Sequence, residues 1–456
     1  MILSKKLNIS ILIFLVISLA FGFTGLSQED LNGTFSVWSV NQQKGPAWEA
    51  QKEALEAFAA KHPGVELDLN LAMNGDVLKT KLPNSFATGA APDMFYVWGG
   101  SKTIKFAKNG FLADLTDLVS TPPLDQYISK TDLSAVSYKG KNYAVPLAGW
   151  GGVFALNTKI FEEAGIEPPP SLYQPTWDEF ISWVKTIRSN TEYAPIVAPA
   201  DRSAMWVPHF WYISLFDRLT EDEYFFRKTI NRVEGYSFTD PPFVEAAERL
   251  KELVDLNAFQ EGFTGDNYAA AISKYQQGDG AIMYNGSWWP PRLKSEAPEV
   301  YENSINIRFP SLQEGVPQDT LLGTIQFFWS VYSNGNTEIA KEFLKFMIHE
   351  QPQYSSKIIE ASSRIPALKG VDPDPEATGA PKFYETTSEK WANSSYKHRA
   401  WNTYSPNEWA QTLLDQLQLL ILGETSPEKF TKALEEKAEE LENNGTLPLS
   451  FWSDPE

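Results

Sequence analysis

The sequence predicts an α/β protein of two lobes, each with a mostly parallel sheet flanked by helices. The chain has 456 residues, more than one hydrophobic core normally supports. Predicted strands and helices alternate along it, which is typical of parallel strands joined by helical crossovers. With 43% hydrophobic and 21% charged residues, the composition is that of a globular protein rather than a disordered or membrane-embedded one.

The N-terminal part shows this alternation most clearly. Val65, Leu67 and Leu69 alternate with polar residues, which indicates a half-buried strand. Pro46 suits the first turn of a helix, where its missing N–H costs nothing, and a Pro-Gly pair after residue 62 ends that helix. The predicted elements are strands over residues 34–40, 65–71 and 93–98 and helices over 46–61, 76–88 and 101–108.

Later segments repeat the pattern. Thr176 and Glu179 form a capping box, in which each side chain can satisfy a free backbone donor of the other residue. Ser426 caps the last helix in a similar way. The predicted strands cover residues 142–146, 152–156, 280–284 and 325–332, and helices cover 176–188, 337–350 and a final segment that begins at 426.

Residues 1–27 have the three parts of a secretory signal peptide. Lys5 and Lys6 form a basic head, residues 9–23 are almost wholly apolar, and Gly25 to Ser27 supply small residues for cleavage before Gln28. An uncleaved membrane anchor is the alternative. The mature protein is therefore expected to be periplasmic or otherwise extracytoplasmic and soluble. It is not expected to be a lipoprotein, because the chain has no cysteine.

Composition excludes several classes of function. The net charge of −19 has the wrong sign for binding nucleic acid or an anionic membrane surface. The absence of cysteine excludes thiolate catalysis and cysteine-ligated metals, and none of the four histidines stands at metal-ligand spacing from another. No phosphate-binding or dinucleotide motif occurs. Asp372, Asp374 and Glu376 lack the full pattern of a calcium loop and favour a solvated turn. No cofactor, metal or catalytic residue is predicted.

The fifteen tryptophans are the unusual feature, and four of them lie beside glycine or polar residues near the ends of predicted strands. Ligands bind at the carboxyl ends of strands in open α/β sheets. Aromatic faces beside amides suit sugars, whose C–H faces stack on rings while their hydroxyls need directed partners. Burial in the core is the alternative for each ring. The four candidates are Trp38, Trp98, Trp150 and Trp288, whereas Trp48, Trp177, Trp183, Trp206 and Trp211 are interpreted as packing.

Several motifs, in order, resemble the extracellular solute-binding proteins of family 1, the maltose-binding-protein-like receptors of carbohydrate ABC importers. The motifs are FAAKHPGVEL at 58–67, ATGAAPDMF at 87–95, AKNGFLADL at 107–115, YKGKNYAVP at 138–146, LNTKIFEEAG at 156–165, TWDEF at 176–180, GAIMYNGSW at 280–288 and AKEFLKF at 340–346. Each motif alone is weak, but their order over nearly the whole mature chain is specific.

The resemblance implies a type II periplasmic-binding-protein fold with a ligand cleft between the lobes. It places lobe 1 at residues 28–147 and 320–366 and lobe 2 at 148–319 and 367–456. Matched by position, the implied ligand-binding residues are Trp38, Asn41, Gln42, Gln43, Trp98, Ser101, Trp150, Trp288, Gly323, Arg364 and Trp409. Trp150 falls where the maltose receptor has an acid, a departure that puts maltose in doubt and favours stacking on a neutral sugar.

The expected function is therefore that of a monomeric substrate-binding protein that delivers a sugar or oligosaccharide to an ABC permease. A secreted carbohydrate-active hydrolase is one alternative, since 58 acidic residues offer many carboxylate pairs. The same receptor fold with a non-sugar solute, such as a polyol or a peptide, is the other.

Overall fold

The computed structural model describes residues 31–40, 45–70 and 75–449. The predicted alternation of strands and helices is confirmed in the first part of the chain, where Pro46 opens a helix and strands precede and follow it. The elements are β1 (Gly33–Trp38), α1 (Pro46–Lys61), β2 (Val65–Asn70), α2 (Gly75–Thr88), β3 (Met94–Val97), α3 (Gly100–Lys108), α4 (Thr116–Ser120), α5 (Lys130–Leu133), β4 (Ser137–Tyr138) and β5 (Lys141–Asn142).

A long strand, β6 (Val145–Asn157), leads into the second part of the chain. Thr176 caps α7 by accepting a hydrogen bond from the Glu179 N–H at 3.2 Å, as predicted, while the Glu179 carboxylate accepts one from Tyr173. The elements after β6 are α6 (Thr158–Glu163), α7 (Trp177–Asn190), β7 (Ala194–Ile196), α8 (Trp206–Phe216), α9 (Phe225–Ile230), α10 (Pro241–Asp255), α11 (Tyr268–Gln276), β8 (Gly280–Gly286), α12 (Pro290–Glu296), α13 (Pro298–Glu302) and β9 (Ser304–Ile307).

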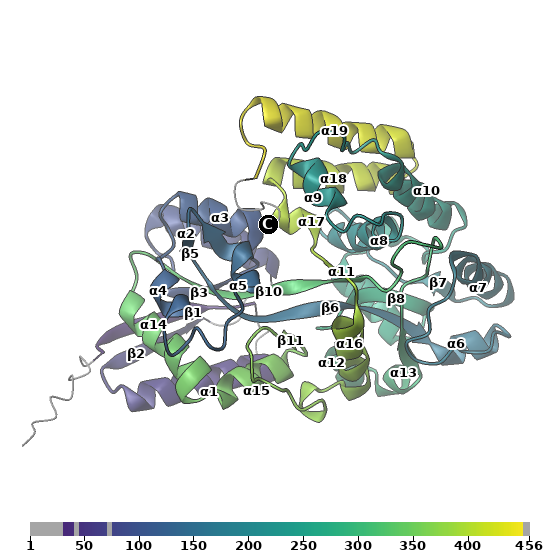
Figure 1. Ribbon diagram of the computed structural model, residues 1–456. Coiled ribbons are helices and arrows are strands. Elements are labelled where there is room, and N and C mark those ends of the chain that lie inside the picture. The colour runs from purple at the N-terminus through teal and green to yellow at the C-terminus, as the bar shows by residue number, and fades with distance from the viewer. Residues whose placement is uncertain (1–30, 41–44, 71–74, 450–456) are drawn as a thin grey trace, which may run out of the picture.

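The last third of the chain returns to the side of the molecule that holds β1–β3 and then crosses back to the side that holds β7–β9 (Figure 1). Helix α14 ends in a π-helical turn over Phe346–Glu350, and Ser426 caps the final helix by accepting from the Lys429 N–H. The elements are β10 (Leu321–Val331), α14 (Thr337–Lys345), α15 (Gln353–Ala361), β11 (Ile365–Pro366), α16 (Pro381–Asn393), β12 (Lys397–His398), α17 (Trp401–Tyr404), α18 (Asn407–Ile421) and α19 (Pro427–Asn443).

Ten of the described strands form one sheet that runs through both halves of the molecule, with the main order β2-β1-β3-β10-β6-β8-β7, and β9, β11 and β12 pair at its side. β4 and β5 form a separate two-stranded antiparallel sheet. We call the part built on β1–β3 the first half and the part built on β7–β9 the second half; they lie left and right in Figure 1. β1 pairs in parallel with β2 and β3, and β7 pairs in parallel with β8, as the alternation predicts. β10 and β6 add antiparallel pairs, so the whole sheet is mixed.

β6 differs from the prediction of two short strands at residues 142–146 and 152–156. Residues 147–151, which were assigned to neither strand, are extended and make β6 a single uninterrupted strand. The first part of β6 pairs with β10 and β11, and its last residues pair with β8 and β9. β6 and β10 therefore join the two halves side by side, as Figure 1 shows.

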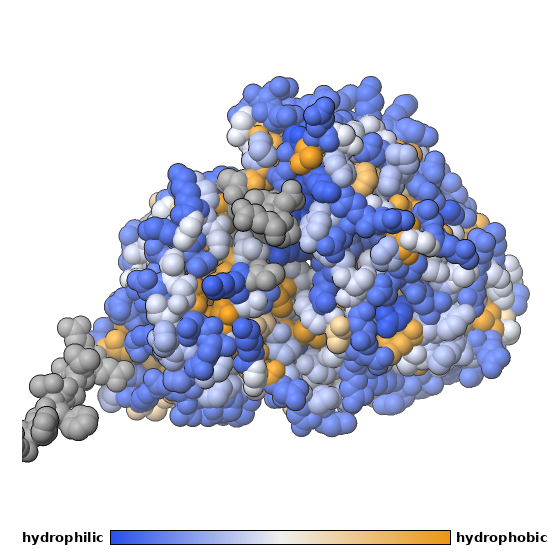
Figure 2. Space-filling view, viewed as in Figure 1, coloured by the Kyte–Doolittle hydropathy of each residue, from blue (hydrophilic) through white to orange (hydrophobic). Residues whose placement is uncertain are grey.

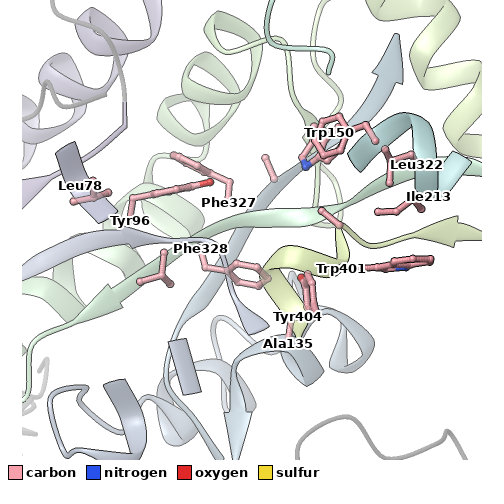
Figure 3. Packing of buried hydrophobic residues seen from close by; sticks show 14 of the residues in the cluster. Leu78, Tyr96, Ala135, Trp150, Ile213, Leu322, Phe327, Phe328, Trp401 and Tyr404 are labelled. Atoms are coloured by element: carbon pink, nitrogen blue, oxygen red, sulfur yellow. The ribbon is translucent and has the colours of Figure 1, made fainter. Parts of the chain in front are cut away.

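Buried side chains cover both faces of these joining strands. In Figure 3, Tyr96, Phe327 and Trp150 lie on one side of β10, and Phe328 and Tyr404 lie on the other. Helix α8 is almost wholly buried, which follows from its uninterrupted apolar and aromatic sequence. In the described part of the chain no helix combines the length and apolar character needed to cross a membrane.

Candidate functional site

The candidate site is built around a bulge in β10. The pairing of β10 with β6 shifts register between Ile325 and Phe327, so Gln326 is the extra residue at that point. A bulge re-aims side chains and frees backbone groups from the ladder. The carbonyl of Gln326 accepts a hydrogen bond from the Tyr96 hydroxyl at 2.8 Å, and its side-chain oxygen accepts one from Trp150 Nε1 at 2.6 Å. Gln326 therefore connects side chains that come from β3 and from β6.

On the first-half side of Gln326 lie Tyr96, Trp98, Phe327 and Arg364, which we call the first-half group. The Tyr96 ring stands edge-on to Trp98, with centroids 4.7 Å apart, and lies 4.8 Å from Phe327. The Arg364 guanidinium lies over the Phe327 ring at 4.7 Å. Tyr96 and Phe327 are buried, whereas Trp98 and Arg364 keep part of their surface exposed.

On the other side lie Trp150, Trp206, Phe210, Tyr268 and Trp288, which we call the second-half group. Trp150 stacks on Phe210 at 5.0 Å and meets Trp288 edge-on at 5.0 Å. Trp206 packs against Tyr268 at 5.1 Å and lies 6.2 Å from Trp288. Trp150 is only 1% exposed, while Trp206, Tyr268 and Trp288 are half-buried.

The hydrogen bonds of the second-half group leave a donor available. The Tyr268 hydroxyl accepts hydrogen bonds from Trp288 Nε1 at 3.0 Å and from Asn285 Nδ2 at 3.1 Å. Burial raises the pKa of Tyr268, so the hydroxyl keeps its proton at neutral pH. Among the described residues no acceptor takes that proton, so the hydroxyl can donate to a ligand. Asn267 fixes its position by capping α11, with Oδ1 accepting from the Ala270 N–H.

The first-half group offers a cationic donor. Arg364 immediately precedes β11, which pairs with β6 at Ala148 and Gly149. Burial lowers the pKa of Arg364, but a guanidinium stays protonated at any physiological pH. Its Nε is buried without a hydrogen-bond partner among the described residues, and within the same set no carboxylate pairs with it. A guanidinium free of a carboxylate can donate to ligand hydroxyls.

Two glycines let these elements approach closely. Gly100 has φ of 68° and follows Trp98 in a tight turn, and a side chain there would lie 2.6 Å from the Thr403 carbonyl oxygen. Its neighbour Ser101 donates hydrogen bonds to the carbonyls of Thr403 (3.2 Å) and Ser405. At Gly286 a side chain would occupy the space that the Trp288 ring fills. Ser101, predicted to contact ligand, thus joins α3 to α17 in this structure.

The structure brings together five of the predicted residues and separates others. Trp98, Trp150, Trp288 and Arg364 lie in the two groups, and Gly323 faces Gly151 across the joining strands. Trp38 is buried at the end of β1, with the Lys81 ammonium over its ring at 4.3 Å. Trp409 is fully buried in α18, where it packs on Phe238 and donates to the Leu434 carbonyl. The segment that holds Asn41, Gln42 and Gln43 lies outside the described residues.

Six residues of the site were not found from the sequence: Tyr96, Phe210, Phe327, Trp206, Tyr268 and Gln326. The first three are buried within apolar segments. Trp206 was interpreted as packing because it opens an apolar segment, yet its position at the start of α8 leaves its ring half-buried. Tyr268 follows the helix cap Asn267, and an aromatic residue at a helix start after a polar loop was the available signal. Gln326 gave no signal, because a bulge inside an apolar strand depends on the partner strand.

Metal binding receives no support from the described residues. Across 31–40, 45–70 and 75–449, no three His, Asp or Glu side chains come together in a way that could hold a metal ion. Asp374, in the acidic turn weighed as a calcium loop, accepts a hydrogen bond from the Glu376 N–H at 3.0 Å, which is a local turn contact.

Comparison with known proteins identifies the family. The sequence model of the bacterial extracellular solute-binding proteins matches residues 42–354, which is more than half of the chain. The chain belongs to this family. The diacetylchitobiose binding protein DasA of Streptomyces coelicolor is 25% identical over 337 residues, 73% of each chain. The maltotriose-binding protein of Pyrococcus abyssi is 24% identical over 330 residues, 72% of this chain and 66% of that one.

Other relatives are matched over less of their length. The chain spans about 60% of the length of a Brucella abortus binding protein, to which it is 24% identical over 267 residues. Solved structures of solute-binding proteins share the fold over nearly the whole chain. A chitin oligosaccharide binding protein superposes with a TM-score of 0.78 at 24% identity, covering 90% of this chain and 98% of that one. Maltose-bound MalE3 of T. maritima superposes with a TM-score of 0.71 at 19% identity, covering 90% and 99%. The predicted type II two-lobe fold is confirmed.

Proposed function

We propose that this solute-binding protein captures a neutral sugar or oligosaccharide between its two halves and delivers it to the permease of an ABC importer. The observation that carries the proposal is the aromatic surface on both sides of Gln326, since half-buried rings stand there beside free polar donors. Sugars need this combination of flat apolar faces and directed hydrogen bonds. The relatives named for diacetylchitobiose and maltotriose support the same class of ligand.

The reachable side chains define the proposed contacts. Trp98 and Trp288 would stack on sugar rings from opposite halves, with Trp206 extending the second surface. Tyr268 and Arg364 would donate to hydroxyls. Among the described residues, neither aromatic group includes an acid, which favours a neutral ligand over an amino sugar with a free ammonium. Trp150 is buried, so it would support Trp288 from behind rather than contact ligand while this conformation persists.

The proposed cycle needs no catalysis. The lobes are proposed to comprise residues 28–147 with 320–366 and 148–319 with 367–456, because β6 and β10 join the halves near the boundaries that this division sets. Binding between the lobes would favour a closed form by the difference in affinity between the two forms. We propose that the closed form docks on the permease as a monomer outside the cytoplasm, after export directed by residues 1–27.

Calorimetry with a panel of sugars tests the proposal. The mature chain is titrated with chito-, malto-, xylo- and galacto-oligosaccharides of one to five units, and each mixture is assayed for release of new reducing ends. We expect binding of at least one sugar with no turnover. If no sugar binds while one is cleaved, the protein is a hydrolase and the proposal is wrong. If only a polyol or peptide binds, the sugar class is wrong.

Tryptophan variants locate the site in the same experiment. Trp98→Ala and Trp288→Ala should each weaken binding by about ten- to a hundredfold, about 1.4–2.7 kcal/mol, because each removes a stacking face. Trp409→Phe is the matched control, since Trp409 is buried away from both groups. Its affinity should equal that of the wild type. Loss of binding in Trp409→Phe with retention in Trp98→Ala and Trp288→Ala would place the site elsewhere.

A further inference from the structure

A small buried cavity lies in the second half beside the joining strands, apart from the two aromatic groups. It is bounded by β6 at Gly152, by β10 at Leu321 and by α16 at Lys390. The volume available to the centre of a water-sized particle is about 10 Å³. By this measure about 10–15 Å³ is the minimum that holds one water molecule, so the cavity has room for about one small occupant.

Three cationic side chains line this cavity together with a single acid. Arg218 and Lys390 are 3% and 4% exposed, and Arg308 and Asp319 complete the charged lining. Lys390 donates to neutral oxygens: the Gly152 carbonyl at 2.8 Å, the Asn306 side-chain oxygen at 2.8 Å and the Ile307 carbonyl at 3.3 Å. Among the described residues, therefore, no carboxylate is bonded to either buried cation, an arrangement that is costly.

The nearby acids are engaged elsewhere. Asp217 is buried next to Arg218 in the chain, but its carboxylate lies 2.7 Å from His398 Nδ1. Asp319 accepts hydrogen bonds from the backbone N–H and the hydroxyl of Ser395. Burial lowers the pKa of Lys390, and repulsion from Arg308 and Arg218 lowers it further. Burial also lowers the pKa of Arg218, and the charges of Asp217 and Asp319 act in the opposite sense against this larger effect.

Donors at the cavity lack acceptors. Arg218 uses its two terminal nitrogens on the carbonyls of Ser214 and Thr320, at 2.9 and 2.8 Å, but its Nε is buried without a partner among the described residues. The Thr320 hydroxyl, on the same wall, is also buried without a partner in that part of the chain. Buried donors are normally satisfied. Two such donors beside clustered cations call for an acceptor that carries negative charge.

We propose that this cavity binds a monatomic anion of the halide class, such as chloride. The anion would accept hydrogen bonds from Arg218 Nε and the Thr320 hydroxyl and would offset the charge of Arg308 and Lys390. It would thereby hold together α8, which Arg218 follows, the start of β10 and α16. The occupant stabilises the second half where the chain crosses between the halves, and this role is independent of the sugar site.

Thermal unfolding of the full mature chain in chloride tests the proposal. Ionic strength is held constant by replacing chloride with methanesulfonate. We expect the unfolding midpoint to rise by several degrees with chloride and to saturate, because an ion that binds only the folded state stabilises it by mass action. Crystals grown in bromide should show an anomalous peak in the cavity. The absence of both signals, which is the result expected for a water molecule, would overturn the proposal.

Variants keep the test decisive. Thr320→Val keeps the shape of the side chain and removes one donor. The chloride concentration that gives half of the rise in unfolding midpoint should therefore be at least tenfold higher in this variant than in the wild type. Lys390→Met removes a cation and should abolish the dependence if the variant folds. Lys159→Met, at an exposed lysine in α6 that does not line the cavity, is the control and should respond as the wild type. Equal chloride responses in Thr320→Val and the wild type, with no bromide peak, would assign the salt effect to general screening.

Discussion

At the scale of single residues, the three-dimensional surroundings of a tryptophan, rather than its neighbours in sequence, decide whether its ring stays partly exposed or is buried. Trp98 and Trp288 come after strands and before a turn or a helix, so part of each ring stays exposed. Trp409 was expected at the site by position, but it faces the packed side of an amphipathic helix, where Phe226 and Phe238 enclose it.

His209 shows how burial alone can lower the pKa of a histidine. Its ring is fully buried in α8, and both nitrogens lack hydrogen-bond partners among the described residues. Desolvation lowers the pKa of His209 from 6.5 to about 3. The folded protein therefore keeps the ring neutral where the unfolded chain protonates it. Its contribution to stability is complete above pH 6.5 and is lost as the pH falls toward 3.

We predict that His209→Phe removes this part of the acid sensitivity. Between pH 7.5 and pH 5 the wild type should lose about 2 kcal/mol of unfolding free energy through this group, and the variant should not. Urea unfolding at both pH values measures the difference. His349→Gln, at an exposed histidine, is the control and should keep the wild-type profile. Equal acid sensitivity in His209→Phe and the wild type would show that the ring is not neutral and buried in solution.

At the scale of elements, the joining strands explain where the sequence prediction was wrong. Two short strands were predicted where β6 is one long strand, and the three glycines at 149, 151 and 152 let another backbone and α16 approach it closely. Gly323 on β10 lies opposite Gly151 on β6. A side chain at Gly323 would lie 2.5 Å from the Trp150 carbonyl oxygen and 3.2 Å from the Trp391 ring. The glycines therefore serve close packing of strands rather than a turn.

Gly323→Ala is predicted to destabilise the protein by about 1–3 kcal/mol, because the added methyl group meets backbone that cannot move aside cheaply. Gly265→Ala is the matched control, since a side chain there meets nothing within 4 Å and the residue does not need a positive φ. Its effect should stay within about 0.5 kcal/mol. Both are measured by urea unfolding at neutral pH. A neutral Gly323→Ala would mean that the joining strands separate more easily than the contacts suggest.

At the scale of the whole molecule, a chain of hydrogen bonds connects the first half to the C-terminal helices. Ser101 on α3 donates to the Thr403 carbonyl, the Thr403 hydroxyl accepts from Gln326 Nε2 at 3.2 Å, and Gln326 holds Trp150. Figure 2 shows hydrophobic residues exposed along the seam between the two halves. The chain of hydrogen bonds therefore couples the position of α17 to the aromatic groups at that seam.

Ser101→Ala is predicted to favour a more open ligand-free molecule. The variant loses the hydroxyl that joins α3 to α17, so small-angle X-ray scattering should give a larger radius of gyration without sugar. Affinity should fall in proportion to the lost fraction of the binding-competent form. Saturating sugar should restore the wild-type radius. Ser189→Ala is the control, because that exposed hydroxyl bonds only within its own helix turn. An unchanged radius of gyration and an unchanged affinity in Ser101→Ala would show that this contact does not affect closure of the two halves.

The sequence by itself determined the α/β fold, most of the strands and helices, and several of their ends. Strand alternation at residues 65–69 and the caps at Thr176 and Ser426 are local signals, and the structure reproduces them. It also indicated that Trp98 and Trp288 stand beside polar turns. These features depend only on residues a few positions apart, so they can be predicted from the sequence without knowing the tertiary structure.

Only the tertiary structure decided which rings meet and how the halves join. The bulge at Gln326 lies where the pairing of β10 with β6 shifts register, and the partners of its side chain are more than seventy residues away in sequence. Trp206 and Tyr268 join Trp288 through packing between α8, α11 and the end of β8. The cationic cavity likewise gathers residues from six separate segments of the chain. Contacts between distant segments depend on the packing of whole elements, and periodicity along one element carries no information about its partner.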